Sequence, residues 1–231
     1  MSYPLNDAII NAGCLMFFNE PAATSRQTDV LDSLLYVQLA ASKRHAKFTE
    51  FEHWKDTWLA ASSRFGWTLQ RSEHISEPAA RGISQTVWDI GARALLGFVG
   101  ETRVAEAEHL VRQPPQPQAL DLLVSQTSQL RADRDKPSET TLVFQIGIVD
   151  APGNLTLLML HFTTRQPLAR DVLFASLDAA SLSGNIELTV CSMRLADLVY
   201  RQFREPFATA LQDRRAALIR PWKEASHAEQ P

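Results

Sequence analysis

The spacing of hydrophobic positions divides the chain into a helical part and a strand-rich part. Up to about residue 131, apolar residues recur every three or four positions, the period of a helix with one buried face. Between residues 140 and 193 apolar positions alternate, as in half-buried strands. Beyond residue 194 the helical period returns. Because helices precede consecutive short strands, the order predicts an α+β fold rather than alternating strand–helix units.

Six helices are expected in the first part. The first runs from about Asp7 to Phe18 and ends at Asn19-Glu20-Pro21. The third begins at the capping box Thr49-Glu50-Phe51-Glu52, whose terminal side chains can satisfy free backbone N–H groups. The expected helices span about 7–18, 28–45, 49–66, 77–99, 101–112 and 118–130, and a short strand covers 67–71.

Two hairpins are expected in the strand-rich part. The first joins 142–149 to 155–163 through a turn at 150–154, and the second joins 172–178 to 185–193. They predict an antiparallel sheet of about four or five strands, closed by a C-terminal helix kinked at Pro206.

These elements predict one domain, 1–223. Its parts are a helical region (1–131), a sheet (140–193) and the C-terminal helix (194–223), with a surface connection at 132–140 and a tail at 224–231.

The alternation assigns each strand residue to one face of the sheet. Pairing Val149 with Leu155 makes one face of the first hairpin wholly apolar, and pairing Asp178 with Asn185 extends that face into the second hairpin. The expected core residues of the first hairpin are Leu142, Phe144, Ile146, Ile148, Leu158, Leu160 and Phe162.

The opposite face is mixed and holds the candidate chemistry. Cys191, His161 and Glu187 could act as nucleophile, base and orienting carboxylate, since a thiol needs a neighbouring imidazole to ionise at neutral pH. The favoured interpretation is structural, with Cys191 as a small buried hydrophobe. A third interpretation is that this face lines a pocket for a small apolar ligand. Its candidate binding residues are Gln145, Leu157, Met159, Phe174 and Ser176.

Two helical motifs resemble metal-binding spacing. Glu50-x-x-His53 and Glu106-x-x-His109 each place a carboxylate and an imidazole on one side of a helix, as in di-iron bundles. Both histidines lie away from the apolar stripes of their helices, so solvated surfaces explain the spacing better. We expect no metal, and the sequence shows no glycine-rich phosphate loop that would indicate a nucleotide cofactor.

Composition and charge exclude several classes of function. With 23 basic against 26 acidic residues the net charge is −3, which disfavours general nucleic-acid binding. Seven basic residues against three acidic ones between residues 194 and 223 could face an anionic partner, but a solvated helix is the simpler interpretation. The longest apolar run, 8–18, is too short to span a bilayer, so no transmembrane segment is expected.

The remaining sequence features predict a cytoplasmic, bacterial protein. Two cysteines are too few for a disulfide framework, and the first residues lack the basic region of a signal peptide; export without such a signal would leave no trace here. The function we favour is non-catalytic: a binding or accessory protein that contacts a protein partner or a second copy of itself. The alternative is a small-molecule enzyme or apolar-ligand carrier that uses the face around His161, Glu187 and Cys191.

Overall fold

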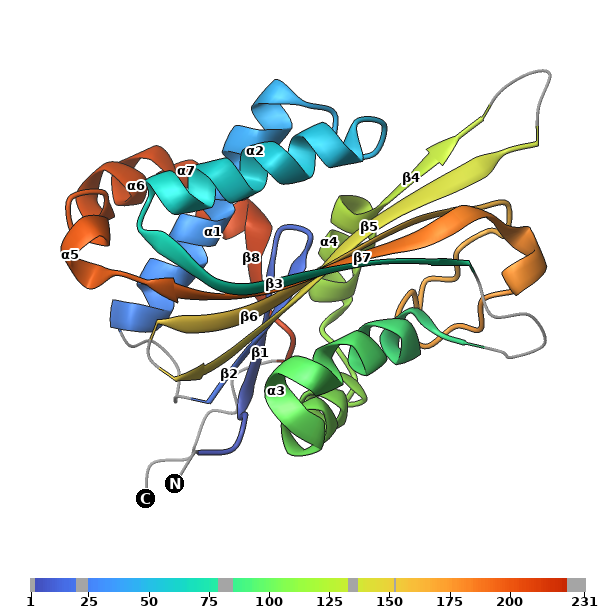
Figure 1. Cartoon of the computed structure of the whole chain (residues 1–231), viewed down its shortest axis with the longest axis horizontal. Coiled ribbons are helices and arrows are strands. Elements are labelled where there is room, and N and C mark those ends of the chain that lie inside the picture. The colour runs from blue at the N-terminus through green and yellow to red at the C-terminus, as the bar shows by residue number, and fades with distance from the viewer. Residues whose placement is uncertain (1–2, 20–24, 79–84, 133–136, 152, 224–231) are drawn as a thin grey trace.

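A computed structural model describes residues 3–19, 25–78, 85–132, 137–151 and 153–223. Within them lie seven α-helices and eight strands (Figure 1). The helices are α1 (Ser25–Arg44), α2 (Phe51–Arg64), α3 (Val87–Val111), α4 (Pro117–Thr127), α5 (Asp197–Tyr200), α6 (Arg204–Ala210) and α7 (Gln212–Leu218). The strands are β1 (Asp7–Asn11), β2 (Cys14–Phe18), β3 (Trp67–Pro78), β4 (Ser128–Arg131), β5 (Glu139–Ala151), β6 (Asn154–Thr164), β7 (Leu182–Leu195) and β8 (Ile219–Pro221).

All eight strands belong to one mixed sheet. Its order is β3-β7-β6-β5-β2-β1-β8, and β4 pairs with β5 beside this path. Every pairing is antiparallel except that of β2 with β5, which is parallel. The α+β class is therefore confirmed, whereas the expected antiparallel sheet of four or five strands was too small and missed the parallel pair.

Each face of the sheet is covered by a helical layer (Figure 1). On one face, α3 and α4 enclose a core with the inward residues of β5, β6 and β7. On the other, α1 and α2 enclose a second core that includes Met16, Trp54, Trp58 and Leu157. Because both faces are covered, β5 and β6 carry buried apolar residues on both sides.

The first predicted hairpin is confirmed in its register. Ile146 lies opposite Leu158 and Leu142 opposite Phe162, as pairing Val149 with Leu155 required. The seven residues of its predicted apolar face are all buried, in the core beneath α3 and α4.

The expected first helix is wrong, because residues 7–18 form the β1–β2 hairpin. Ala12 adopts a left-handed φ of 51° at the turn, beside Gly13. All five residues of β2 are buried, so this strand has no polar face. A short continuous apolar run of this kind fits a buried strand as well as a helix, and periodicity cannot separate the two.

The second predicted hairpin is also wrong. Residues 172–178 form turns, with one isolated bridge from Leu177 to Gln85, and β7 pairs instead with β6 and β3. The loop still buries Leu173 and Leu177 in the core beneath α3, which explains their apolar character.

Several helix boundaries differ from the expected ones. The helices expected at 77–99 and 101–112 are one helix, α3, kinked at Gly100 with a φ of 80°. Residues 77–78 belong to β3, and residues 79–84 lie outside the described part of the chain. α3 begins with a capping box of Thr86 and Asp89, whereas Glu50, the N-cap residue before α2, makes no side-chain cap, so the box expected at Thr49 is absent. The sixth expected helix ends at Thr127, where β4 begins.

The C-terminal region is a series of short helices instead of one kinked helix that closes the sheet. Pro206 lies in the first turn of α6, where a missing N–H costs little, and β8 returns to pair with β1. Arg204 makes two hydrogen bonds to the buried Asp29 of α1, at 2.8 and 2.6 Å, and Arg215 pairs in the same way with Asp32. These two cations are therefore engaged within the molecule.

The remaining expectations about the chain's surface are partly outside the described residues. Residues 133–136 of the expected connection at 132–140 lie outside the described residues. The expected tail, 224–231, also lies outside them. Among the helices that the structure describes, none is long and apolar enough to cross a lipid bilayer.

Candidate functional site

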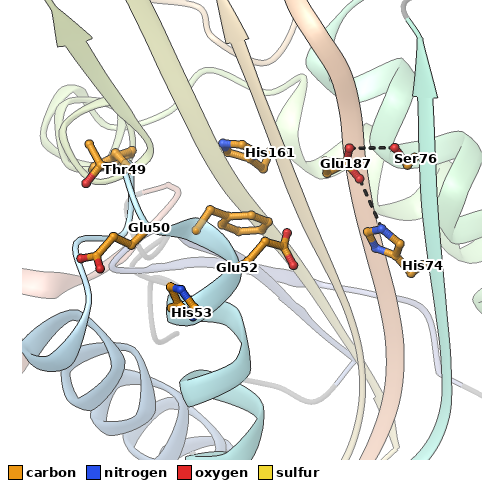
Figure 2. Close-up of a pocket in the computed structure, with 10 residues that line it drawn as sticks. Thr49, Glu50, Glu52, His53, His74, Ser76, His161 and Glu187 are labelled. Carbon is orange, nitrogen blue, oxygen red and sulfur yellow. Dashed lines mark hydrogen bonds and ion pairs between the residues drawn. The ribbon is translucent and has the colours of Figure 1, made fainter.

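An open groove of about 650 Å³ lies where the start of α2 faces β6, β7 and β3 (Figure 2). Its size falls in the range of small-ligand and side-chain pockets. Histidine and glutamate side chains come from both sides: the α1–α2 connection and α2 supply one wall, and the three strands supply the other. The lining residues are Phe48, Thr49, Glu50, Phe51, Glu52, His53, His74, Ser76, His161 and Glu187.

Glu187 of β7 organises the strand wall of the groove. Its carboxylate accepts a hydrogen bond of 2.7 Å from the Ser76 hydroxyl and lies 3.3 Å from Nε2 of His74 (Figure 2). The other ring nitrogen of His74 is 3.2 Å from the hydroxyl of Thr189. His74 and Ser76 are alternate residues of β3, which brings both side chains to the same face. The carboxylate is held in place but remains partly exposed to the groove.

His161 lies directly opposite Glu187 in the β6–β7 pairing. Its ring stacks on Phe51 at a centroid distance of 4.5 Å, and its Nδ1 has no hydrogen-bond partner among the described residues. Burial lowers the pKa of His161 below its usual value, and the nearby carboxylates of Glu52 and Glu187 oppose this effect. The imidazole is therefore neutral at pH 7.

The helical wall adds two more carboxylates. Glu50 accepts a hydrogen bond of 2.9 Å from the backbone N–H of Ala46, and this bond lowers the pKa of Glu50. Glu52 is 2.5 Å from Nζ of Lys55. The described lining residues include three carboxylates, those of Glu50, Glu52 and Glu187, and neither lysine nor arginine. The groove is therefore acidic.

The candidate catalytic residues are only partly brought together. His161 and Glu187 are neighbours, but Cys191 lies four residues further along β7, opposite Leu157, or about 13 Å away at 3.3 Å per residue. Cys191 is fully buried in the core beneath α1 and α2, and burial raises its pKa to about 12. The thiol is far from the groove and un-ionised at neutral pH.

The candidate ligand-binding residues are divided between the two sides of the sheet. Gln145, Leu157 and Met159 are buried on the side of α1 and α2, as expected. Phe174 instead packs on the opposite side against Trp88, and Ser176 lies exposed in the same loop. The expected common face for all five residues is wrong because 172–178 is not a strand.

The two metal-like motifs lie on opposite sides of the sheet. Glu50 and His53 line the groove at the start of α2, whereas Glu106 and His109 belong to α3. Glu106 accepts hydrogen bonds from the backbone of Leu5 and from Arg103. Among the described residues, no group of three or more histidine, cysteine, aspartate or glutamate side chains is arranged to hold a metal ion.

Sequence reasoning missed His74 and Ser76. They belong to β3, which was expected to end near Arg71 because the rest of the strand is polar. The alternation of Ser72, His74 and Ser76 with Glu73 and Ile75 was the available signal, but it lacked the apolar face that makes a strand recognisable.

Comparison with known proteins gives no family. No family model matches the chain, and no curated protein matches it. The chain is similar in structure to the activated Cyt2Ba monomer of Bacillus thuringiensis subsp. israelensis, with a TM-score of 0.47 and 9% identity over 81% of this chain and 99% of that one. A delta-endotoxin gives 0.46 and 9% over 80% and 81%. The Evf virulence factor gives 0.38 and 9% over 92% and 85%. At these scores the likenesses carry no argument about function.

Proposed function

We propose that this protein is a non-catalytic binding protein that acts through protein–protein contacts, and that the groove receives a basic side chain of its partner. The observation that carries the proposal is the charge of the groove: Glu50, Glu52 and Glu187 line it, and no lysine or arginine is among its lining residues in the described part of the chain. A carboxylate-lined groove favours an ammonium or guanidinium group, which it can bind through charge-assisted hydrogen bonds. Lys55 offsets part of the charge from its position beside Glu52.

The hydrogen bonds of the groove support binding over catalysis. In a hydrolase triad the hydroxyl donates to an imidazole, which takes its proton. Here the Ser76 hydroxyl donates to Glu187 instead. The thiol considered as a nucleophile, that of Cys191, is buried away from His161 and Glu187.

We also propose that the protein works in a reducing compartment, such as the cytoplasm of a bacterium. Cys14 and Cys191 are both buried and unpaired. Disulfides are rare in reducing compartments, and free thiols persist there.

Binding of charged hexapeptides tests the proposed role of the groove. A fluorescent hexa-arginine peptide should bind, whereas hexa-glutamate should not, in an anisotropy titration at physiological salt. The double variant Glu50→Gln and Glu187→Gln should weaken hexa-arginine binding by about tenfold or more, because two charge-assisted contacts are lost. The matched control is the double variant Glu101→Gln and Glu205→Gln, which removes the same net charge. Both of these residues lie on exposed helical surfaces away from the groove. Equal affinities of both double variants, or no binding of hexa-arginine, would contradict the proposal.

A further inference from the structure

One edge of the sheet is a long exposed strand. The strand order ends at β3, which has 12 residues, nine of them exposed, and pairs with β7 on its inner side. At the opposite end of the order, β8 has three residues. An exposed edge presents a row of backbone N–H and C=O groups that can pair with another strand.

A bulge divides β3 into two segments. The pairing with β7 shifts between Leu69 and Arg71, and the longer part, from Arg71 to Pro78, keeps one regular register. In this regular segment Ile75 packs into the core beneath α3, and Arg71 donates to the backbone of Gly97 in α3. The odd-numbered residues 71–77 thus face α3, and Ser72, His74 and Ser76 face the layer of α1 and α2.

We propose that β3 pairs antiparallel with β3 of a second copy of this chain, with His74 on the two-fold axis. The axis stands perpendicular to the sheet, so that each helical layer continues on its own side. This arrangement places Arg71 opposite Glu77 of the second copy, twice in the dimer, and pairs the whole segment from Arg71 to Glu77.

Charge selects this register over its neighbours. An axis through Glu73 would bring two Glu73 carboxylates together, and an axis through Ile75 would bring Glu73 opposite Glu77. Like charges directly opposite each other destabilise a strand pair, whereas opposite charges stabilise it. An axis through Ser72 would pair only residues 71–73 of the regular segment. Charges and bulges commonly protect an edge strand from association, but here opposite charges coincide in the register with the longest overlap.

The dimer would also join the two grooves. His74 lines the groove, and on the two-fold axis it would lie beside His74 of the second copy. Each groove would then be bordered by a residue of the other chain. The inference about the dimer does not rest on the proposed function, because it follows from the edge strand alone.

Charge reversal tests the register. Sedimentation equilibrium from about 1 μM to about 1 mM, the range of weak to moderate affinities, should show the native chain approaching twice its 25.8 kDa mass. Arg71→Glu and Glu77→Arg should each weaken the dimer by about tenfold or more, because each creates like-charge pairs, and the double variant should restore it. A native chain that stays monomeric, or a dimer that neither single variant weakens, would overturn the proposal.

A cysteine cross-link tests the same register without altering Arg71 or Glu77. Residues opposite each other in a sheet have Cβ atoms close enough for a disulfide. Under mild oxidation with oxidised glutathione, His74→Cys should cross-link with itself, whereas the matched control Ser72→Cys should not. The two native cysteines are buried and stay out of the reaction. Arg71 and Glu77 also contact residues of α3, so the cross-link is the deciding test if the charge variants fail to fold. Cross-linking of Ser72→Cys but not of His74→Cys would refute the register.

Discussion

Replacing Lys47 with methionine should change how the stability of this protein depends on pH. Lys47 lies in the connection between α1 and α2, and its ammonium donates a hydrogen bond of 2.8 Å to the backbone carbonyl of Gln126 near the end of α4. The ammonium occupies the space over Gly13 where a larger residue would place its Cβ. Burial lowers the pKa of Lys47 to about 8, and Cys14 opposes the shift.

The sign of the effect follows from linkage. The folded protein holds the Lys47 proton less tightly than the unfolded chain, whose lysine has a pKa of 10.5. Below pH 8 both states are protonated, and the full cost of burying the charge is present. Between pH 8 and 10.5 the folded state loses its proton first, so the cost disappears as pH rises. A fall from 10.5 to about 8 corresponds to about 3 kcal/mol.

The comparison with Lys47→Met isolates this effect from other groups. Burial raises the pKa of Cys14 and Cys191, which makes the folded state of both proteins less stable as pH rises above about 9. These losses are common to both proteins and cancel in the difference. We expect the free energy of unfolding of the native chain, relative to that of Lys47→Met, to rise by about 2–3 kcal/mol between pH 7 and 10.5. The value is reduced because the Lys47 side chain is only partly buried along its length.

Urea unfolding of both proteins at several pH values measures this difference. A difference that stays constant within about 0.5 kcal/mol from pH 7 to 10.5 would refute the argument, because it would show that the Lys47 proton is held equally by both states.

Three further predictions concern the cores and the C-terminal region. Leu158→Ala, in the core beneath α3, should lower the free energy of unfolding, measured by urea denaturation, by about 2–5 kcal/mol. A loss of less than about 0.5 kcal/mol would contradict the assigned face. In a chain with Cys14→Ser, Cys191 should react slowly with iodoacetamide at pH 7, because its thiol is buried and un-ionised; rapid labelling of the folded protein would favour a nucleophile. Asp32→Asn should cost about 1–3 kcal/mol in the same urea assay, since it breaks the paired hydrogen bonds to Arg215, and an unchanged midpoint would show that this contact does not stabilise the fold.

The first hairpin was predictable because its signals are local. Its residues alternate, and the composition from Asp150 to Asn154 is typical of a turn, so the register followed from a few neighbouring residues. The β1–β2 hairpin gives no such signal, since β2 is buried on both sides and the partner of Cys14, Gln145, is remote in the sequence. Its strand character is set by the pairing with β5, a long-range contact that a local pattern does not contain.

The groove shows the same limit at the level of single residues. Placing His161 and Glu187 on one face required only the alternation of two strands, and the structure indeed pairs them. The other wall needs the docking of α2 over the sheet, where Phe51 stacks on His161. In the sequence Phe51 is one more apolar residue of a helical stripe, although in the structure it stacks on an imidazole and lies between Glu50 and Glu52, which line the groove together with Glu187. The acidic character of the groove is therefore a property of helix docking, which explains why residues that looked like an isolated metal motif and residues that looked like part of a triad meet at one site.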